Sequence, residues 1–161
     1  MKKIFVAIIA LLLLSIGLTS CGANVPRPEI KEGRFNITVT YEYNGEVKEA
    51  SGVYVCEYDG VNWWDINADP YANWKESYEG DIQDDGIIPI CNTDDGGEIF
   101  ISLLMYPEYF MGDPEHAEAT PIVRAEIFYD DRQIDDADVI AEYGVKLIDC
   151  KYDKPIENTY K

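Results

Sequence analysis

The chain has few basic residues and a large excess of acidic ones. Its 161 residues include 13 Lys and Arg against 31 Asp and Glu, which gives a formal net charge of −18 at pH 7. Nucleic acids are bound mainly through Lys and Arg contacts to phosphate, and so negative a chain repels the phosphate backbone. We therefore exclude DNA and RNA as partners. The charge permits cationic partners, although it also serves solubility.

The common catalytic motifs are also missing. The sequence contains no CxxC pair, no G-x-S-x-G nucleophile motif, no phosphate-binding loop and no dinucleotide or zinc-protease fingerprint. The single histidine, His116, lies in the acidic segment MGDPEHAEA (111–119), where a solvated side chain is more typical than a metal ligand. We expect no enzyme activity, no cofactor and no metal. A carboxylate-dependent hydrolase is the weaker alternative, because among 31 acids some pair has the required spacing by chance.

One acidic segment has some features of a calcium loop. DIQDDGIIPICN (81–92) offers oxygen-bearing side chains at loop positions 1, 3 and 5 and a glycine at position 6. Asn92 stands at position 12, however, where an EF-hand needs a bidentate Glu. Turn chemistry favours the same residue types, so we predict a β-turn between strands. Weak calcium binding remains an open alternative.

A long apolar run occurs at the N-terminus. Met1-Lys2-Lys3 is followed by the apolar run Ile4 to Leu14 and then by small residues. The run is shorter than the roughly 20 residues that a membrane span needs. It is typical of an export signal, which we assign to residues 1–20.

The end of this signal resembles the lipobox of bacterial lipoproteins. LTSC, residues 18–21, has an apolar residue and two small ones before a cysteine. The resemblance implies that Cys21 becomes a lipidated mature N-terminus, held in the cell membrane on its extracytoplasmic side by several acyl chains. We predict a lipidated tether over residues 21–34 and a single domain over 35–161. The alternative is an ordinary secretory signal with an incidental cysteine.

The remainder of the chain shows mainly a two-residue periodicity. Apolar and polar residues alternate from Phe35 to Tyr43, and Asn44-Gly45 follows as a strong hairpin signal before a returning strand. Asp59-Gly60 predicts a second hairpin turn, which opens into VNWWDI (61–66). Further strands are predicted at 86–91, 98–104, 122–129 and 145–152, with one short helix at 135–144 near the C-terminus. We expect a mainly β protein, an antiparallel β-sandwich of immunoglobulin-like type, with a small partly open β-barrel as the alternative.

Four short motifs carry a resemblance to a known group. They are VCEYDGVNW (55–63), YFMGDPE (109–115), EYGVKLI (142–148) and PIEN (155–158). With these the chain resembles uncharacterised small acidic lipoproteins of Gram-positive gut bacteria. The resemblance implies a compact β-rich lipoprotein and assigns no catalytic residue.

Three cysteines remain after Cys21. Cys56, Cys91 and Cys150 can form at most one intramolecular disulfide, with three possible pairings. We expect buried free thiols, because export permits a disulfide without requiring one. A single disulfide is the alternative.

The aromatic segment NWWDINADPYANW (62–74) supplies the candidate ligand site. Trp63, Trp64, Tyr71 and Trp74 lie among acids that would suit a cation, a basic peptide or the C–H faces of a sugar. Neighbouring Trp63 and Trp64 would point to opposite faces of a strand. We expect a non-catalytic binding or interaction module at the cell surface, with a protein, peptide or glycan ligand. The alternative is a structural envelope-associated protein in which these aromatic residues pack the core.

Overall fold

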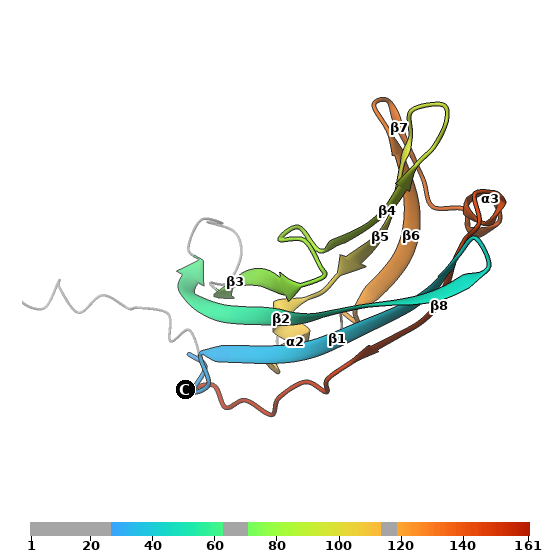
Figure 1. The fold of residues 1–161 in the computed structure, drawn as a ribbon. Helices are drawn as coiled ribbons and strands as arrows, with labels where there is room; N and C mark the ends of the chain where they lie inside the picture. Colours follow the sequence, from blue (N-terminus) through green and yellow to red (C-terminus); the bar gives the residue numbers. More distant parts are fainter. Residues whose placement is uncertain (1–26, 63–70, 114–118) are drawn as a thin grey trace, which may run out of the picture.

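The protein is mainly β. A computed structural model describes residues 27–62, 71–113 and 119–161, which form two four-stranded antiparallel sheets and two short helices (Figure 1). The first sheet has the order β3-β2-β1-β8, and the second has the order β4-β5-β6-β7. The elements are β1 (Glu32–Tyr43), β2 (Glu46–Asn62), β3 (Tyr71–Gly80), β4 (Ile87–Asn92), β5 (Glu98–Leu104), α2 (Pro107–Phe110), β6 (Ile122–Tyr129), β7 (Arg132–Ile134), α3 (Ala137–Glu142) and β8 (Val145–Tyr152).

Strands that follow one another in the sequence lie side by side within each sheet. The exception is β8, which returns from the second sheet and pairs with β1. The sheets spread apart toward α3 and β7, so the arrangement is open (Figure 1). The mainly β class is confirmed, whereas an immunoglobulin-like connectivity, which uses Greek-key connections, is not shown.

The predicted hairpin at Asn44-Gly45 is confirmed. All 12 residues of β1 pair with β2, from Glu32 opposite Glu57 to Tyr43 opposite Glu46. Asn44 has a φ of 53° and Gly45 a φ of 82°, and both central residues of a type I′ turn need such positive values. The turn therefore sets the register of the longest strand pair.

The second predicted hairpin, at Asp59-Gly60, is wrong. Both residues lie inside β2, which continues to Asn62. Pairing with β3 shifts between Tyr58 and Val61, and Gly60 has a φ of 91°, so the glycine forms a β-bulge and not a turn. The Asp-Gly dipeptide correctly indicated a positive φ, but a positive φ at glycine occurs in β-bulges as well as in hairpin turns.

The other predicted elements agree closely with the structure. β5, β6 and β8 have the predicted bounds, and β4 is displaced from its prediction by one residue. The predicted helix appears as α3, where the Asp136 carboxylate accepts hydrogen bonds from the backbone amides of Asp138 and Val139. Gly144 follows with a φ of 74°. β3, β7 and α2 were not predicted.

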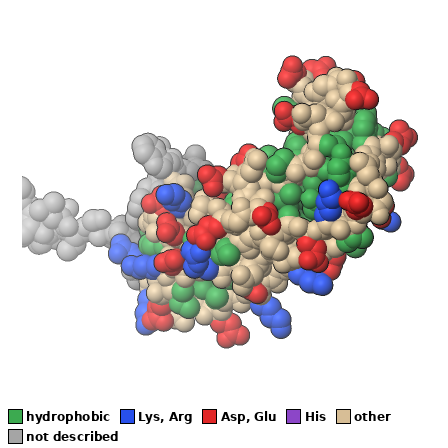
Figure 2. Space-filling view, viewed as in Figure 1, with side chains coloured by type: hydrophobic (Ala, Val, Ile, Leu, Met, Phe, Trp, Pro, Cys, Tyr) green, Lys and Arg blue, Asp and Glu red, His purple; other side chains and the backbone are tan. Residues whose placement is uncertain are grey.

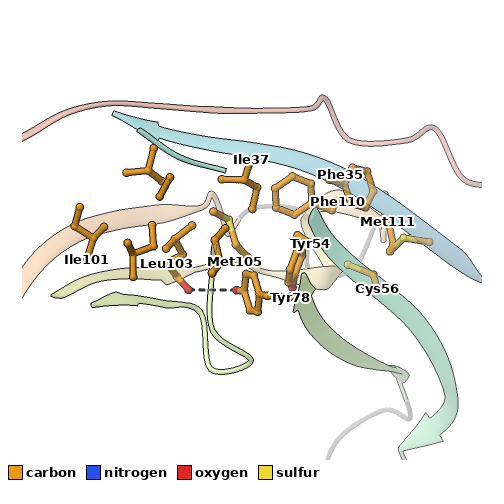
Figure 3. Close-up of a cluster of buried hydrophobic side chains, with 14 residues drawn as sticks. Phe35, Ile37, Tyr54, Cys56, Tyr78, Ile101, Leu103, Met105, Phe110 and Met111 are labelled. Atoms are coloured by element: carbon orange, nitrogen blue, oxygen red, sulfur yellow. Dashed lines mark hydrogen bonds between the residues drawn. The ribbon is translucent and has the colours of Figure 1, made fainter. Parts of the chain in front are cut away.

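Side chains from both sheets form one buried cluster (Figure 3). The ring of Phe110 in α2 lies 4.8 Å from that of Phe35 and 5.3 Å from that of Tyr54. The Tyr78 hydroxyl donates a hydrogen bond of 3.3 Å to the carbonyl of Leu103 and so links β3 to β5. The sheets are therefore joined mainly by apolar and aromatic contacts.

A second, smaller cluster lies beneath α3. Ile140 of this helix packs against Ile99, Ile127 and Tyr129 of the second sheet and against Val145 of β8. The helix thus contacts both β6 and β8, which belong to different sheets. Tyr143, which follows the helix, has an exposed side chain and is not part of this cluster.

We expect the inter-sheet cluster to dominate stability. Ile101→Ala removes a fully buried side chain from β5, which should lower the free energy of unfolding by about 2–5 kcal/mol. Val47→Ala, at a side chain that is 65% exposed, should change it by less than about 0.5 kcal/mol. Urea denaturation of both variants measures the difference. Equal effects would contradict the packing described above.

Candidate functional site

The structure describes only part of the predicted aromatic site. Cys21, Trp63, Trp64 and His116 lie outside the described residues. Tyr71 and Trp74 are described, and both lie on β3.

Tyr71 and Trp74 do not share a face of the sheet. They are three positions apart in a strand, where side chains alternate between the two faces. Trp74 packs against the inter-sheet cluster, with its ring 5.6 Å from that of Tyr58 in an edge-on contact. The Tyr71 hydroxyl accepts a hydrogen bond of 2.8 Å from Asn62 on the neighbouring strand. A single aromatic platform containing both residues is therefore not formed, and a ligand-binding role of each residue stays a prediction.

All three described cysteines are free thiols, and the disulfide alternative is not found. Cys56 is fully buried in β2, and burial raises the pKa of its thiol to about 12. Burial also raises the pKa of Cys150 to about 11. Thiols with such pKa values remain protonated near neutral pH, so neither is an activated nucleophile.

The acidic segment at 81–92 forms a turn and a strand, as expected. The backbone amide of Gly86 donates to the Gln83 carbonyl at 2.9 Å, and the Gln83 amide donates to the Ile87 carbonyl at 2.9 Å. The Asp81 carboxylate accepts a hydrogen bond from the Ser51 amide and so ties the loop to β2. Among the described ranges, no group of three or more His, Cys, Asp or Glu side chains is arranged to hold a metal ion.

A pocket of about 560 Å³ opens on the outer side of the second sheet. Ile87 and Pro89 of β4, Phe100 of β5 and Phe128 of β6 contribute its apolar lining. Asp85, from the loop before β4, and Glu98, at the start of β5, supply carboxylates. A volume of this size falls in the range of small-molecule and side-chain binding pockets.

The pocket belongs to a larger apolar surface. On β5, Ile99, Ile101 and Leu103 point inward and are buried, so Phe100 and Leu104 lie on the opposite face. On β6 the same alternation places Ile122 and Phe128 outward. We call this surface the outer apolar face and define it by Ile87, Pro89, Phe100, Leu104, Ile122 and Phe128.

The outer apolar face is elongated and exposed. Leu104 is 42%, Ile122 44% and Phe128 48% exposed. Figure 2 shows hydrophobic side chains gathered where β4, β5 and β6 lie. At roughly 3.3 Å per residue, the six-residue separation of Ile122 and Phe128 along β6 spans about 20 Å. Several large apolar side chains exposed on one sheet face are a common feature of binding surfaces.

An ion pair between a buried carboxylate and a partly exposed guanidinium interrupts the apolar face. Glu126 lies on β6 between Arg124 and Phe128, directly opposite Phe100, and is only 3% exposed. Its carboxylate pairs with the guanidinium of Arg124, which also contacts Asp135 at 3.3 Å. A carboxylate so buried needs a charged partner, because desolvation otherwise disfavours its ionised form.

The charges around the pocket are predominantly negative. Asp85 and Glu98 are exposed at its rim, and no Lys or Arg is among the described residues that line it. The one nearby guanidinium on this side of the sheet, in the described part of the chain, is that of Arg124, and two carboxylates already neutralise it. The pocket therefore combines an apolar floor with a negative rim.

A smaller pocket of about 260 Å³ lies at the β4–β5 turn and includes Tyr43, Asp95 and Tyr143. Its central carboxylate already has partners within the protein. Asp95 accepts hydrogen bonds from the hydroxyls of Thr93, at 2.5 Å, and Tyr129, at 3.1 Å, and the Thr93 bond is the main cause of its lowered pKa. We assign this cluster to turn stability.

Sequence reasoning did not find the outer apolar face. A sequence signal for it was present in EIFISLL (98–104) and IVRAEIFY (122–129). In both strands, apolar residues occupy odd and even positions, so both faces of the strand carry apolar side chains. Such runs are also typical of strands that are buried on both sides. Only the arrangement of the two sheets shows that, among the described residues, one side of β5 and β6 is left uncovered.

Comparisons with protein-family models, with curated proteins and with solved structures found no match. Within the described ranges, no helix is long and apolar enough to cross a membrane.

The Arg124–Glu126 pair leads to a stability prediction. Arg124→Met should lower the free energy of unfolding by about 3 kcal/mol, because it leaves the Glu126 carboxylate buried without a partner. Arg124→Met combined with Glu126→Leu should recover most of that loss. Denaturant unfolding of the single and double variants measures both effects.

Lys151→Met is the matched control for this prediction. It breaks an exposed ion pair with Asp149 at 3.6 Å and should cost less than about 1 kcal/mol. If the double variant were as unstable as Arg124→Met alone, the loss of stability in Arg124→Met would not come from the unpaired Glu126 carboxylate.

Proposed function

We propose that the protein is a non-catalytic binding module that a lipid on Cys21 holds at the extracytoplasmic side of the cell membrane, and that its ligand site is the outer apolar face. The observation that carries the proposal is the exposed apolar surface with its pocket of about 560 Å³. A purely structural envelope protein would gain nothing from leaving this surface uncovered. A carboxylate-dependent hydrolase remains the weaker alternative.

At a finer level, we propose that the two sheets pack around the shared cluster as a β-sandwich whose strands are connected as in a partly open barrel. The consecutive strand order, with β8 beside β1, is the order of an up-and-down barrel opened along two seams. It therefore supports the partly open barrel more than an immunoglobulin-like connectivity.

The ends of the described chain favour display of the site away from the membrane. Arg27 and Lys161 exchange backbone hydrogen bonds of 2.7 and 2.9 Å, so these two ends lie together. They are at the opposite end of the molecule from the β4–β5 and β6–β7 turns (Figure 1). A lipid on Cys21 would thus attach near this end and leave the outer apolar face accessible.

The anchor is tested by Cys21→Ala. We expect the wild-type protein in the membrane fraction and the variant in the medium or soluble fraction, because several acyl chains are needed for stable attachment. Cys91→Ala, which alters a partly exposed thiol of the folded domain, should leave the distribution unchanged. A Cys21→Ala variant that stayed in the membrane fraction would contradict the anchor.

The binding site is tested by Phe128→Ser. The probe is a fluorescently labelled peptide in which Leu and Gln alternate, with the full chain in phosphatidylcholine nanodiscs and empty nanodiscs as the blank. Burial of a Phe side chain contributes about 1.5–3 kcal/mol, so the variant should bind the probe at least about tenfold more weakly.

Ile148→Ser is the matched control for this experiment. Ile148 is also 48% exposed but lies on β8 of the first sheet, so the substitution should leave probe affinity unchanged. Wild-type binding no stronger than the blank, or equal losses in the two variants, would reject the outer apolar face as the site.

A further inference from the structure

We infer that the ligand of the outer apolar face is an extended peptide segment that carries both apolar and basic side chains. The inference rests on the proposed function, since it specifies the ligand of that same site. Three features of the surface determine the ligand class: its length, the charges around it and the character of its edge strand.

The length favours a chain over a compact molecule. The face extends about 20 Å from Phe128 to Ile122, which corresponds to about six residues of an extended peptide. Apolar positions lie at both of its ends: Leu104 of β5 is opposite Ile122 of β6, and Phe100 lies one outward position away from Phe128, with Arg124 and Glu126 between the two ends. A compact ligand would fill the pocket and leave Leu104 and Ile122 uncovered.

The charges favour a basic segment. Asp85 and Glu98 are exposed at the pocket rim, whereas Glu126 and Asp135 lie beside the single guanidinium of Arg124. Lys and Arg side chains can lay their aliphatic stems along apolar surface and place their charged ends at such a rim. The net charge of −18 on the whole chain would further attract a basic segment and repel an acidic one.

The edge strand favours docking on the face of the sheet. β4 is the edge strand of the second sheet that borders the pocket, β7 being the other edge, and Pro89 stands near the middle of β4, where it has no backbone N–H to offer an added strand. Pairing along β4 is therefore interrupted. A peptide gains more by laying its side chains across Pro89 and Phe100 than by extending the sheet.

A second copy of this chain is a poorer occupant. Two copies that met through this face would bring together the same acidic rim, and each carries a net charge of −18. Like-charge juxtaposition at an interface opposes association.

The test compares three labelled peptides of equal length, in which Leu alternates with Lys, with Gln or with Glu. The full chain is held in phosphatidylcholine nanodiscs, and fluorescence anisotropy gives each affinity. At about 0.1 M salt we expect the Lys peptide to bind at least about tenfold more tightly than the Glu peptide. The ratio should fall toward one at about 1 M salt, because the Debye length shortens from about 10 Å to about 3 Å.

Substitution of the rim separates its effect from that of the overall charge. Asp85→Asn with Glu98→Gln should weaken the Lys peptide about fivefold and leave the Gln peptide unchanged. Glu46→Gln with Glu49→Gln removes the same charge from exposed positions of β2 and should have less than about a twofold effect. Equal losses in the two double variants would overturn the assignment of the rim as the selective element.

Failure of the inference is distinguishable from failure of the proposed function. If all three peptides bound equally and Phe128→Ser weakened each of them, the site would stand and its preference for basic segments would be rejected. If no peptide bound above the blank, both would be rejected. If native mass measurement showed two copies in each nanodisc, and Phe128→Ser separated them, a second copy would be the occupant and the inference would be overturned.

Discussion

The register of the β1–β2 hairpin is the constraint on which the rest of the structure depends. The turn at Asn44-Gly45 fixes which residues of the two strands lie opposite each other, and so which face holds Phe35 and Tyr54. A shift of one residue would move every side chain of a strand to the other face. Because Phe35 and Tyr54 form the surface on which α2 and the second sheet pack, such a shift would remove the inter-sheet cluster.

This constraint also explains why the second sheet has an uncovered side. Its inner face packs against the β1–β2 hairpin and α3, which bury residues such as Ile101 and Ile127. The last strand, β8, pairs with β1 and not with β7. Nothing in the described chain is left to cover the outward side chains of β5 and β6. The outer apolar face is thus a consequence of the topology and not of a few misplaced residues.

Local sequence patterns predicted most strands but not the outer apolar face. Strands β5, β6 and β8 could be predicted because turn residues bound their apolar runs closely. β3 could not, since Lys75 and Glu76 interrupt its alternation; the Glu76 carboxylate instead accepts the hydrogen bond of the buried Tyr54 hydroxyl at 2.5 Å. Asp59-Gly60 was misassigned because turns and bulges use the same positive φ. The outer apolar face could not be predicted, because it depends on which side of the second sheet the first sheet covers. That arrangement is set by contacts between residues far apart in sequence.

An exposed apolar sheet face is an aggregation hazard, and three features of this molecule reduce that hazard. Pro89 interrupts hydrogen bonding along the edge strand β4. The guanidinium of Arg124, whose side chain is 41% exposed, lies within the apolar surface, so a flat apolar partner would have to desolvate this charge without replacing its solvation. The net charge of −18 opposes the association of two copies of the chain. Each feature opposes self-association while leaving the face open to a basic segment, whose charged groups could remain solvated at the rim. The same residues that oppose self-association would therefore give the proposed site its selectivity.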